Sequence, residues 1–131
     1  MEDLSRRASG ARRTRRGRLS RSAEFERAYR QGRSHGNRHL VVYAFPRGSG
    51  EDARARLGVS VSRKVGGAVD RNRVKRLLRE AFAAELALVP AGHDVVVVAR
   101  PESRDLAERE GLEGVRGALR ELLEQAARAS A

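Results

Sequence analysis

The sequence contains no cysteine and no tryptophan, and its aromatic residues are limited to three Phe and two Tyr among 131 residues. The absence of cysteine excludes disulfide bonds, thiolate zinc sites and cysteine nucleophiles. With so few rings, a hydrophobic core has to be built mainly from Val, Leu and Ala. The length suits one compact domain and is too short for two ordinary ones.

Long apolar segments are also missing from the sequence. No apolar run approaches the roughly 20 residues that a membrane-spanning helix requires. The basic residues near the N-terminus are not followed by the apolar stretch of a signal peptide. The sequence therefore predicts a cytoplasmic protein that does not span a membrane.

Acidic residues are scarce in the first part of the chain. Lys and Arg number 28 against 17 Asp and Glu, a net charge of +11, and the whole positive excess lies before residue 80. This imbalance favours a polyanionic partner such as RNA, DNA or an acidic membrane surface. Residues 1–18 are rich in Arg, Ser and Gly and poor in apolar side chains, which predicts a flexible basic arm. A single domain is expected over 19–131.

The hydrophobic pattern predicts a small α/β sandwich. A hairpin-like loop over 48–52 is expected to join the first two strands, and a third strand arises if 38–46 is split. Four consecutive Val residues in the strand 94–100 indicate burial on both faces and a central position. Three glycines weaken the first half of the last helix. The expected elements are a helix over 23–31, strands over 39–45 and 56–62, a helix over 70–88, the strand over 94–100 and a helix over 105–128.

The helix expected over 70–88 separates its residues into two faces. At 3.6 residues per turn, one side is apolar and consists of Val74, Leu77, Leu78, Ala81 and Phe82. The opposite side carries Asn72, Lys75, Arg76 and Arg79, with Arg71 and Arg73 on its flanks. No Glu is interleaved within 71–79, so like charges repel one another unless a polyanion binds. The pattern favours a phosphate-binding face over the alternative of a merely solvated one.

Three of the aromatic residues form a second constellation. Phe25 and Tyr29 share one face of the first expected helix, and Tyr43 lies on the strand that follows. Unpaired bases stack on such rings without a sequence requirement. The alternative, equally compatible with the pattern, is that Phe25 and Tyr29 pack inward as core anchors.

Signatures of a protein-borne catalytic centre are absent from the sequence. There is no phosphate-binding P-loop and no nucleophile elbow. His35 and His39 lack a third ligand and are expected at the surface. Because acidic residues are scarce in the basic region, a two-metal nuclease centre is not expected either. We therefore predict no catalytic residue and no metal site in the protein itself.

Residues 18–128 resemble the protein subunit of bacterial ribonuclease P. The resemblance rests on Phe25-x-x-x-Tyr29, on Asn37-Arg38 and on a long central block. That block runs Arg56-Leu57-Gly58-Val59-Ser60-Val61-Ser62-Arg63-Lys64-Val65-Gly66 and continues as Ala68-Val69-Asp70-Arg71-Asn72-Arg73-Val74-Lys75-Arg76-Leu77-Leu78-Arg79-Glu80.

The resemblance implies an α+β fold of order α-β-β-β-α-β-α, with a four-stranded sheet and a left-handed crossover around the basic helix, against the usual preference. It also implies a ribonucleoprotein in which a large catalytic RNA holds Mg²⁺ and removes the 5′ leader of precursor tRNA. The protein would promote this Mg²⁺-dependent cleavage by binding the catalytic RNA and the leader. No catalytic residue, tightly bound cofactor, membrane contact or obligate protein partner is expected.

The resemblance further assigns roles to individual residues. Those expected to bind the leader are Phe25, Tyr29, Tyr43, Asn72, Lys75 and Arg79. Those expected to contact the catalytic RNA are Arg63, Lys64, Arg71, Arg73 and Arg76. The alternative function is that of a structural RNA-binding protein such as a small ribosomal protein. A sequence-specific DNA regulator is disfavoured, because one basic helix without a helix-turn-helix partner matches no common docking geometry.

Overall fold

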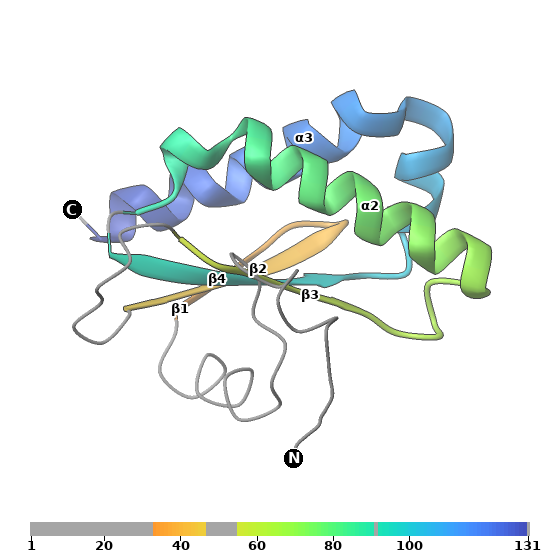
Figure 1. Ribbon diagram of the computed structural model, residues 1–131, viewed down its shortest axis with the longest axis horizontal. Helices are drawn as coiled ribbons and strands as arrows, with labels where there is room; N and C mark the ends of the chain where they lie inside the picture. The colour runs from red at the N-terminus through yellow and green to blue at the C-terminus, as the bar shows by residue number, and fades with distance from the viewer. Residues whose placement is uncertain (1–32, 47–54, 91, 131) are drawn as a thin grey trace, which may run out of the picture.

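A four-stranded mixed sheet with two long helices on one face forms the computed structural model, which describes residues 33–46, 55–90 and 92–130 (Figure 1). The predicted helix over 23–31, the loop over 48–52 and the basic arm lie outside the described residues. From the first strand onward, the element order agrees with the predicted α+β fold. The elements are β1 (Arg33–Gly36), β2 (Leu40–Pro46), β3 (Leu57–Val61), α2 (Ala68–Ala84), the short 3₁₀ helix η2 (Leu86–Leu88), β4 (His93–Ala99) and α3 (Ser103–Ser130).

The strands lie in the order β1-β2-β4-β3, which confirms the central position predicted for β4. β4 pairs antiparallel with β2 and parallel with β3. Two expectations were wrong. The third strand comes from Arg33–Gly36 and not from a division of 38–46, and β2 and β3 do not form a hairpin. The reason is that β4 is apolar on both faces. Such a strand is best buried in the middle of the sheet, and β4 therefore lies between β2 and β3.

The helix α2 connects the parallel strands β3 and β4. Its buried residues are the predicted apolar set, Val74, Leu77, Leu78, Ala81 and Phe82. It begins at Ala68 and ends at Ala84, whereas the prediction was 70–88. The last residues of the predicted range instead form the separate turn η2.

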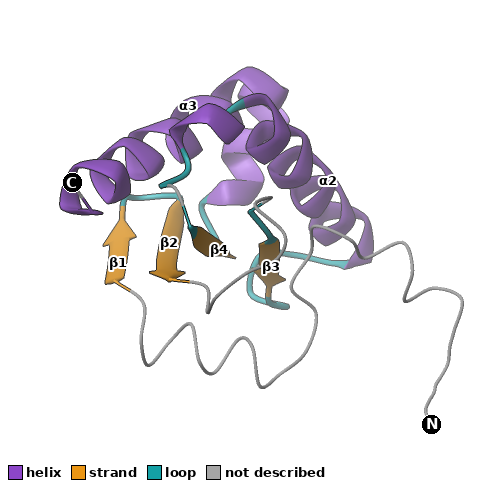
Figure 2. Cartoon of the chain, turned by 60° about the vertical axis from the view of Figure 1, so that its left-hand side comes forward, coloured by secondary structure: helices purple, strands orange, loops and turns teal. Residues whose placement is uncertain are grey.

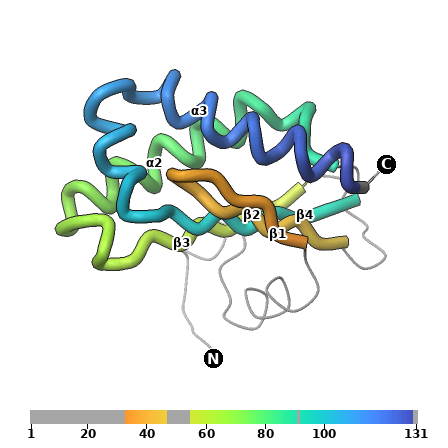
Figure 3. The backbone as a smooth tube through the Cα atoms, turned by 180° about the vertical axis from the view of Figure 1, so that it is seen from behind, coloured from red at the N-terminus to blue at the C-terminus, as the bar shows by residue number. Residues whose placement is uncertain are grey.

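The helix α3 is interrupted at Gly111, where the backbone adopts φ 59° and ψ −145°. One continuous helix over 105–128 was therefore a wrong expectation at this point. The positive φ is a conformation that glycine adopts without steric cost. The segment before it buries Leu106 and Ala107, and the longer segment after it buries Leu119 and Leu122. The glycine-rich half of α3, which was expected to be weak, therefore contains a change in chain direction (Figure 3).

The two faces of the sheet are covered differently. Both long helices pack on the same face, where Val42, Val95 and Val97 contribute to the main core (Figure 2). Alternation along the strands sends their neighbours to the opposite face, where no described helix lies. We call this the outer sheet face; it carries a small cluster formed by Phe45 and Val96, with Tyr43 and Val98 packed against it.

Three polar side chains form hydrogen bonds that join segments far apart in the sequence. Asp94, which is 0% exposed, accepts hydrogen bonds from the backbone N–H of Arg56 at 2.8 Å and from its Nη2 at 2.8 Å. Asn37 accepts the N–H of Leu40 in the β1–β2 turn and donates to the carbonyl of Ala118 in α3 at 3.0 Å. The third, Glu85, follows α2 and binds α3 as described below.

Candidate nucleic-acid interface

The polar side of α2 lies opposite its buried side, as predicted. Asn72 and Arg76 are exposed, and Lys75 and Arg79 are half-buried along the edges of the same row. Since the core residues of α2 hold the helix against the sheet, the row faces away from the hydrophobic core. We call Asn72, Lys75, Arg76 and Arg79 the α2 row.

Two of the three cations in this row have no carboxylate partner among the described residues. Within the described ranges, neither Lys75 nor Arg76 forms an ion pair. On the flank of α2 that faces α3, Arg73 Nη1 lies 3.9 Å from Glu108 Oε2, and both side chains are largely exposed. Exposed pairs of this kind are weak. The positive charges of Lys75 and Arg76 therefore remain available to a polyanion.

The turn between β3 and α2 extends the basic surface. Arg63 and Lys64 are exposed in this turn. It is closed by hydrogen bonds from the N–H of Val65 to the carbonyl of Ser62 at 3.0 Å and from the N–H of Gly66 to the carbonyl of Arg63 at 3.2 Å. Because the turn leads directly into the first turn of α2, the two basic side chains lie at the N-terminal end of that helix.

Two unsatisfied groups lie at the same end of α2. The N-cap residue Gly67 offers no side chain to the first N–H groups of the helix. Arg71 Nε is buried without a hydrogen-bond partner in the described structure. A buried donor without a partner is costly, and helix N-termini favour anions. This end of α2 is thus suited to a negatively charged ligand.

The predicted aromatic surface is represented here by Tyr43, since Phe25 and Tyr29 lie outside the described residues. Tyr43 is half-buried on the outer sheet face, paired in register with Val96. The helix α2 packs on the other face, beside the edge strand β3. The described residues therefore do not bring Tyr43 and the α2 row together in one cleft; β4 and β3 lie between β2 and that edge.

Arg100 is a basic residue that the sequence analysis missed. It is exposed directly after β4 and, by alternation, shares the outer face with Val96 and Val98. A Cβ built on Gly36 of β1 would lie 3.3 Å from Arg100 Nη2, so the guanidinium covers this glycine. The period of two along the strand was the signal that could have found it. Arg100 adds a cation to the face that carries Tyr43.

The arginines of α3 are used differently from those of α2. Glu85 Oε2 accepts hydrogen bonds from Arg116 Nη2 at 2.8 Å and from Arg120 Nη2 at 2.9 Å. The bonds from Arg120 and Arg116 lower the pKa of Glu85 below its ordinary value, against the opposing effect of burial. These two guanidinium groups therefore join α3 to the end of α2.

Neither a metal cluster nor a membrane-spanning helix is found in the part of the chain that the structure describes. No group of three or more His, Asp or Glu side chains there could hold a metal ion. His35 and His39 line different hollows and do not converge. No described helix has the length and hydropathy needed to cross a membrane.

Comparison with known proteins gives consistent matches over most of the chain. Residues 14–126 match the family described as Ribonuclease P. The ribonuclease P protein component of Clostridium novyi is 38% identical over 109 residues, which span 83% of this chain and 92% of that protein. The corresponding protein of Shouchella clausii is 41% identical over 109 residues, 83% of this chain and 84% of its own length.

Solved structures of the same kind have a similar fold. The RNase P protein of Staphylococcus aureus superimposes with a TM-score of 0.72 at 35% identity, covering 84% of this chain and 94% of that one. The RNase P protein of Thermotoga maritima gives a TM-score of 0.72 at 33% identity, covering 82% of this chain and 96% of that one.

Proposed function

The chain belongs to the ribonuclease P protein family, and we propose that it binds a catalytic RNA and promotes removal of the 5′ leader from precursor tRNA. In this proposal the catalytic centre and the Mg²⁺ ions it needs are held mainly by the RNA. The protein supplies the surface that binds the RNA and positions the leader. The observation that carries the proposal is the α2 row, whose Lys75 and Arg76 have no carboxylate partner among the described residues.

The basic surface is proposed to have two tasks, carried by two sets of residues that alternate along α2. The N-terminal end of α2 and the turn before it contact the catalytic RNA; the unsatisfied Arg71 Nε and the uncapped helix start support this assignment. The residues concerned are Arg63, Lys64, Arg71, Arg73 and Arg76. Phosphates of the leader are bound by Asn72, Lys75 and Arg79.

The leader bases are proposed to stack on the outer sheet face. Tyr43 offers a ring there, and Arg100 offers a cation for the adjoining phosphate. Gly58 and Ser60 of β3 fall on the same face, in register with Val96 and Val98. On this face β4 lies between the strand of Tyr43 and the edge strand β3, which is beside α2. The spacing from β2 to β4 and the spacing from β4 to β3 together amount to about 10 Å, a distance that about two nucleotides span. Phe25 and Tyr29, proposed for the same task, lie outside the described residues.

Reconstitution with the cognate catalytic RNA tests the proposed function. Added protein should raise the rate of 5′ leader removal at Mg²⁺ concentrations where the RNA alone is slow. The rate is measured from the appearance of mature 5′ ends on labelled precursor tRNA. A structural RNA-binding protein, the alternative function, would bind the RNAs and leave the rate unchanged. That outcome would overturn the proposal.

Replacing Tyr43 with alanine should weaken binding of precursor tRNA to the reconstituted complex by about tenfold. One lost base stack is worth about 1–3 kcal/mol. Affinity for mature tRNA should not change, because mature tRNA has no leader. The dissociation constants of both RNAs are compared, with Tyr43→Phe as the control that keeps the ring. Equal losses for both RNAs, together with a lower Tm, would show that Tyr43 serves only the cluster of Phe45 and Val96.

A further inference from the structure

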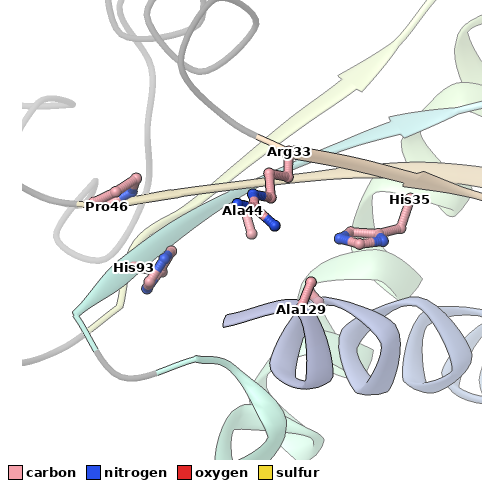
Figure 4. A pocket seen from close by; sticks show the side chains of 7 residues that line it. Arg33, His35, Ala44, Pro46, His93 and Ala129 are labelled. Atoms are coloured by element: carbon pink, nitrogen blue, oxygen red, sulfur yellow. The ribbon is translucent and has the colours of Figure 1, made fainter. Parts of the chain in front are cut away.

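A pocket of about 280 Å³ opens at the end of the sheet that lies under the last turns of α3 (Figure 4). Its basic lining consists of Arg33 and His35 from β1 and His93 from β4. Figure 4 shows these side chains directed toward the same hollow, with Ala129 of α3 on the other side. The remaining lining residues from β2 and α3 carry no charge: Ala44, Pro46, Ala126 and Ala129.

The register of the sheet explains why these three basic side chains converge. Arg33 pairs with Ala44, and His93 pairs with Pro46, so both lie at the same end of the sheet. Alternation places Arg33, His35 and His93 on the face that the helices cover. Elsewhere this face is apolar and closed by the main core, whereas here the described lining from α3 consists of the small side chains of Ala126 and Ala129.

No carboxylate is found among the described residues that line this pocket. Arg33 is exposed and has no carboxylate partner in the described ranges. By contrast, Arg56 and Arg116 each bind a buried carboxylate at 2.8 Å. The described part of its lining has one guanidinium and two imidazoles, a set suited to an anion, and guanidinium groups match phosphate oxygens especially well.

We propose that this pocket binds a phosphate group of an RNA backbone, as a second RNA contact remote from α2. The inference rests on the proposed function for the identity of the polyanion. The turn that carries Arg63 and Lys64 follows Val61, which pairs with Ala99 at the far end of β4. His93 begins that strand, so about 20 Å separates the two ends. An RNA segment bound here is therefore distinct from one bound at the start of α2.

An intramolecular role is the competing explanation for the three basic groups. They lie near the C-terminal end of α3, where the helix dipole places partial negative charge that cations stabilise. In that case their removal lowers the Tm and leaves RNA binding unchanged. The two explanations therefore predict different measurements on the same variants.

The imidazole signals of the full chain provide the first measurement. The sequence contains three histidines, and the third, His39, lines a different hollow and serves as an internal control. Titration with inorganic phosphate should shift the NMR signals of His35 and His93 saturably and leave those of His39 unchanged. Equal responses of all three histidines would overturn the proposal.

The double variant Arg33→Gln/His93→Gln provides the second measurement, with His39→Gln as its matched control. Its affinity for the cognate catalytic RNA should fall about tenfold, and the slope of log K against log salt should decrease by about one. An unchanged slope with a lower Tm would assign the basic groups to the end of α3 and overturn the proposal. Saturable binding of inorganic phosphate without a change in RNA affinity would assign the pocket to free phosphate and overturn the RNA contact. If the wild-type protein does not raise the rate of leader removal but the double variant still changes the salt slope, the proposed function is wrong and the RNA contact at this pocket is retained.

Discussion

Replacing Arg63 and Arg76 together with alanine is expected to weaken binding of the catalytic RNA by on the order of 100-fold. Each side chain is taken to make one charge-assisted contact with a phosphate, worth about 1.5–3 kcal/mol. The slope of log K against log salt should fall by up to about two, since each lost contact releases one counterion fewer. Fluorescence titrations over a series of salt concentrations measure both quantities.

A control variant on α3 separates a specific interface from general charge. Arg109 and Arg128 are exposed, and neither has a carboxylate partner in the described part of the chain. The double variant Arg109→Ala/Arg128→Ala removes the same net charge and should change the RNA affinity much less. Equal losses for the two double variants would show that binding depends on net charge alone. An unchanged salt slope for Arg63→Ala/Arg76→Ala would exclude phosphate contacts of these two side chains.

The second large effect concerns stability, and it is expected from Arg56→Ala. The Arg56 guanidinium binds the carboxylate of Asp94, whose side chain is 0% exposed, through Nε at 3.1 Å and Nη2 at 2.8 Å. Removing one partner of a buried pair leaves the other charge buried, at a cost of about 3–5 kcal/mol. Since the Arg56 side chain is 33% exposed, water replaces part of the interaction. We therefore expect a loss of about 3 kcal/mol in the free energy of unfolding.

Denaturant unfolding of three variants tests this expectation. Arg56→Ala should lower the free energy of unfolding most, and Arg56→Ala/Asp94→Asn should recover part of the loss because no buried charge remains. Lys64→Ala, at an exposed position of the turn before α2, should stay within about 0.5 kcal/mol of the wild type. A loss below about 1 kcal/mol for Arg56→Ala would show that the pair behaves as an ordinary surface ion pair.

Local periodicity was sufficient for much of the fold and for half of the candidate site. The two faces of α2 follow from side chains that recur every three or four residues, so Val74 and Leu77 were assigned to the core and Lys75 and Arg76 to the opposite side. The run of Val in β4 identified the central strand for the same reason. Each of these patterns is contained within one helix or strand, and tertiary packing does not change it.

The tertiary structure alone decided how the elements meet. The sequence determined that β2, β3 and β4 are strands, but pairing between residues far apart in the chain placed β4 between the other two. That placement buries Asp94 beside Arg56, puts Tyr43 on the face opposite α2, and gathers Arg33, His35 and His93 into one pocket. Such relations depend on hydrogen bonds between whole strands and on which apolar faces can be buried together. These are properties of the assembled sheet, whereas the charge row of α2 is a property of one helix.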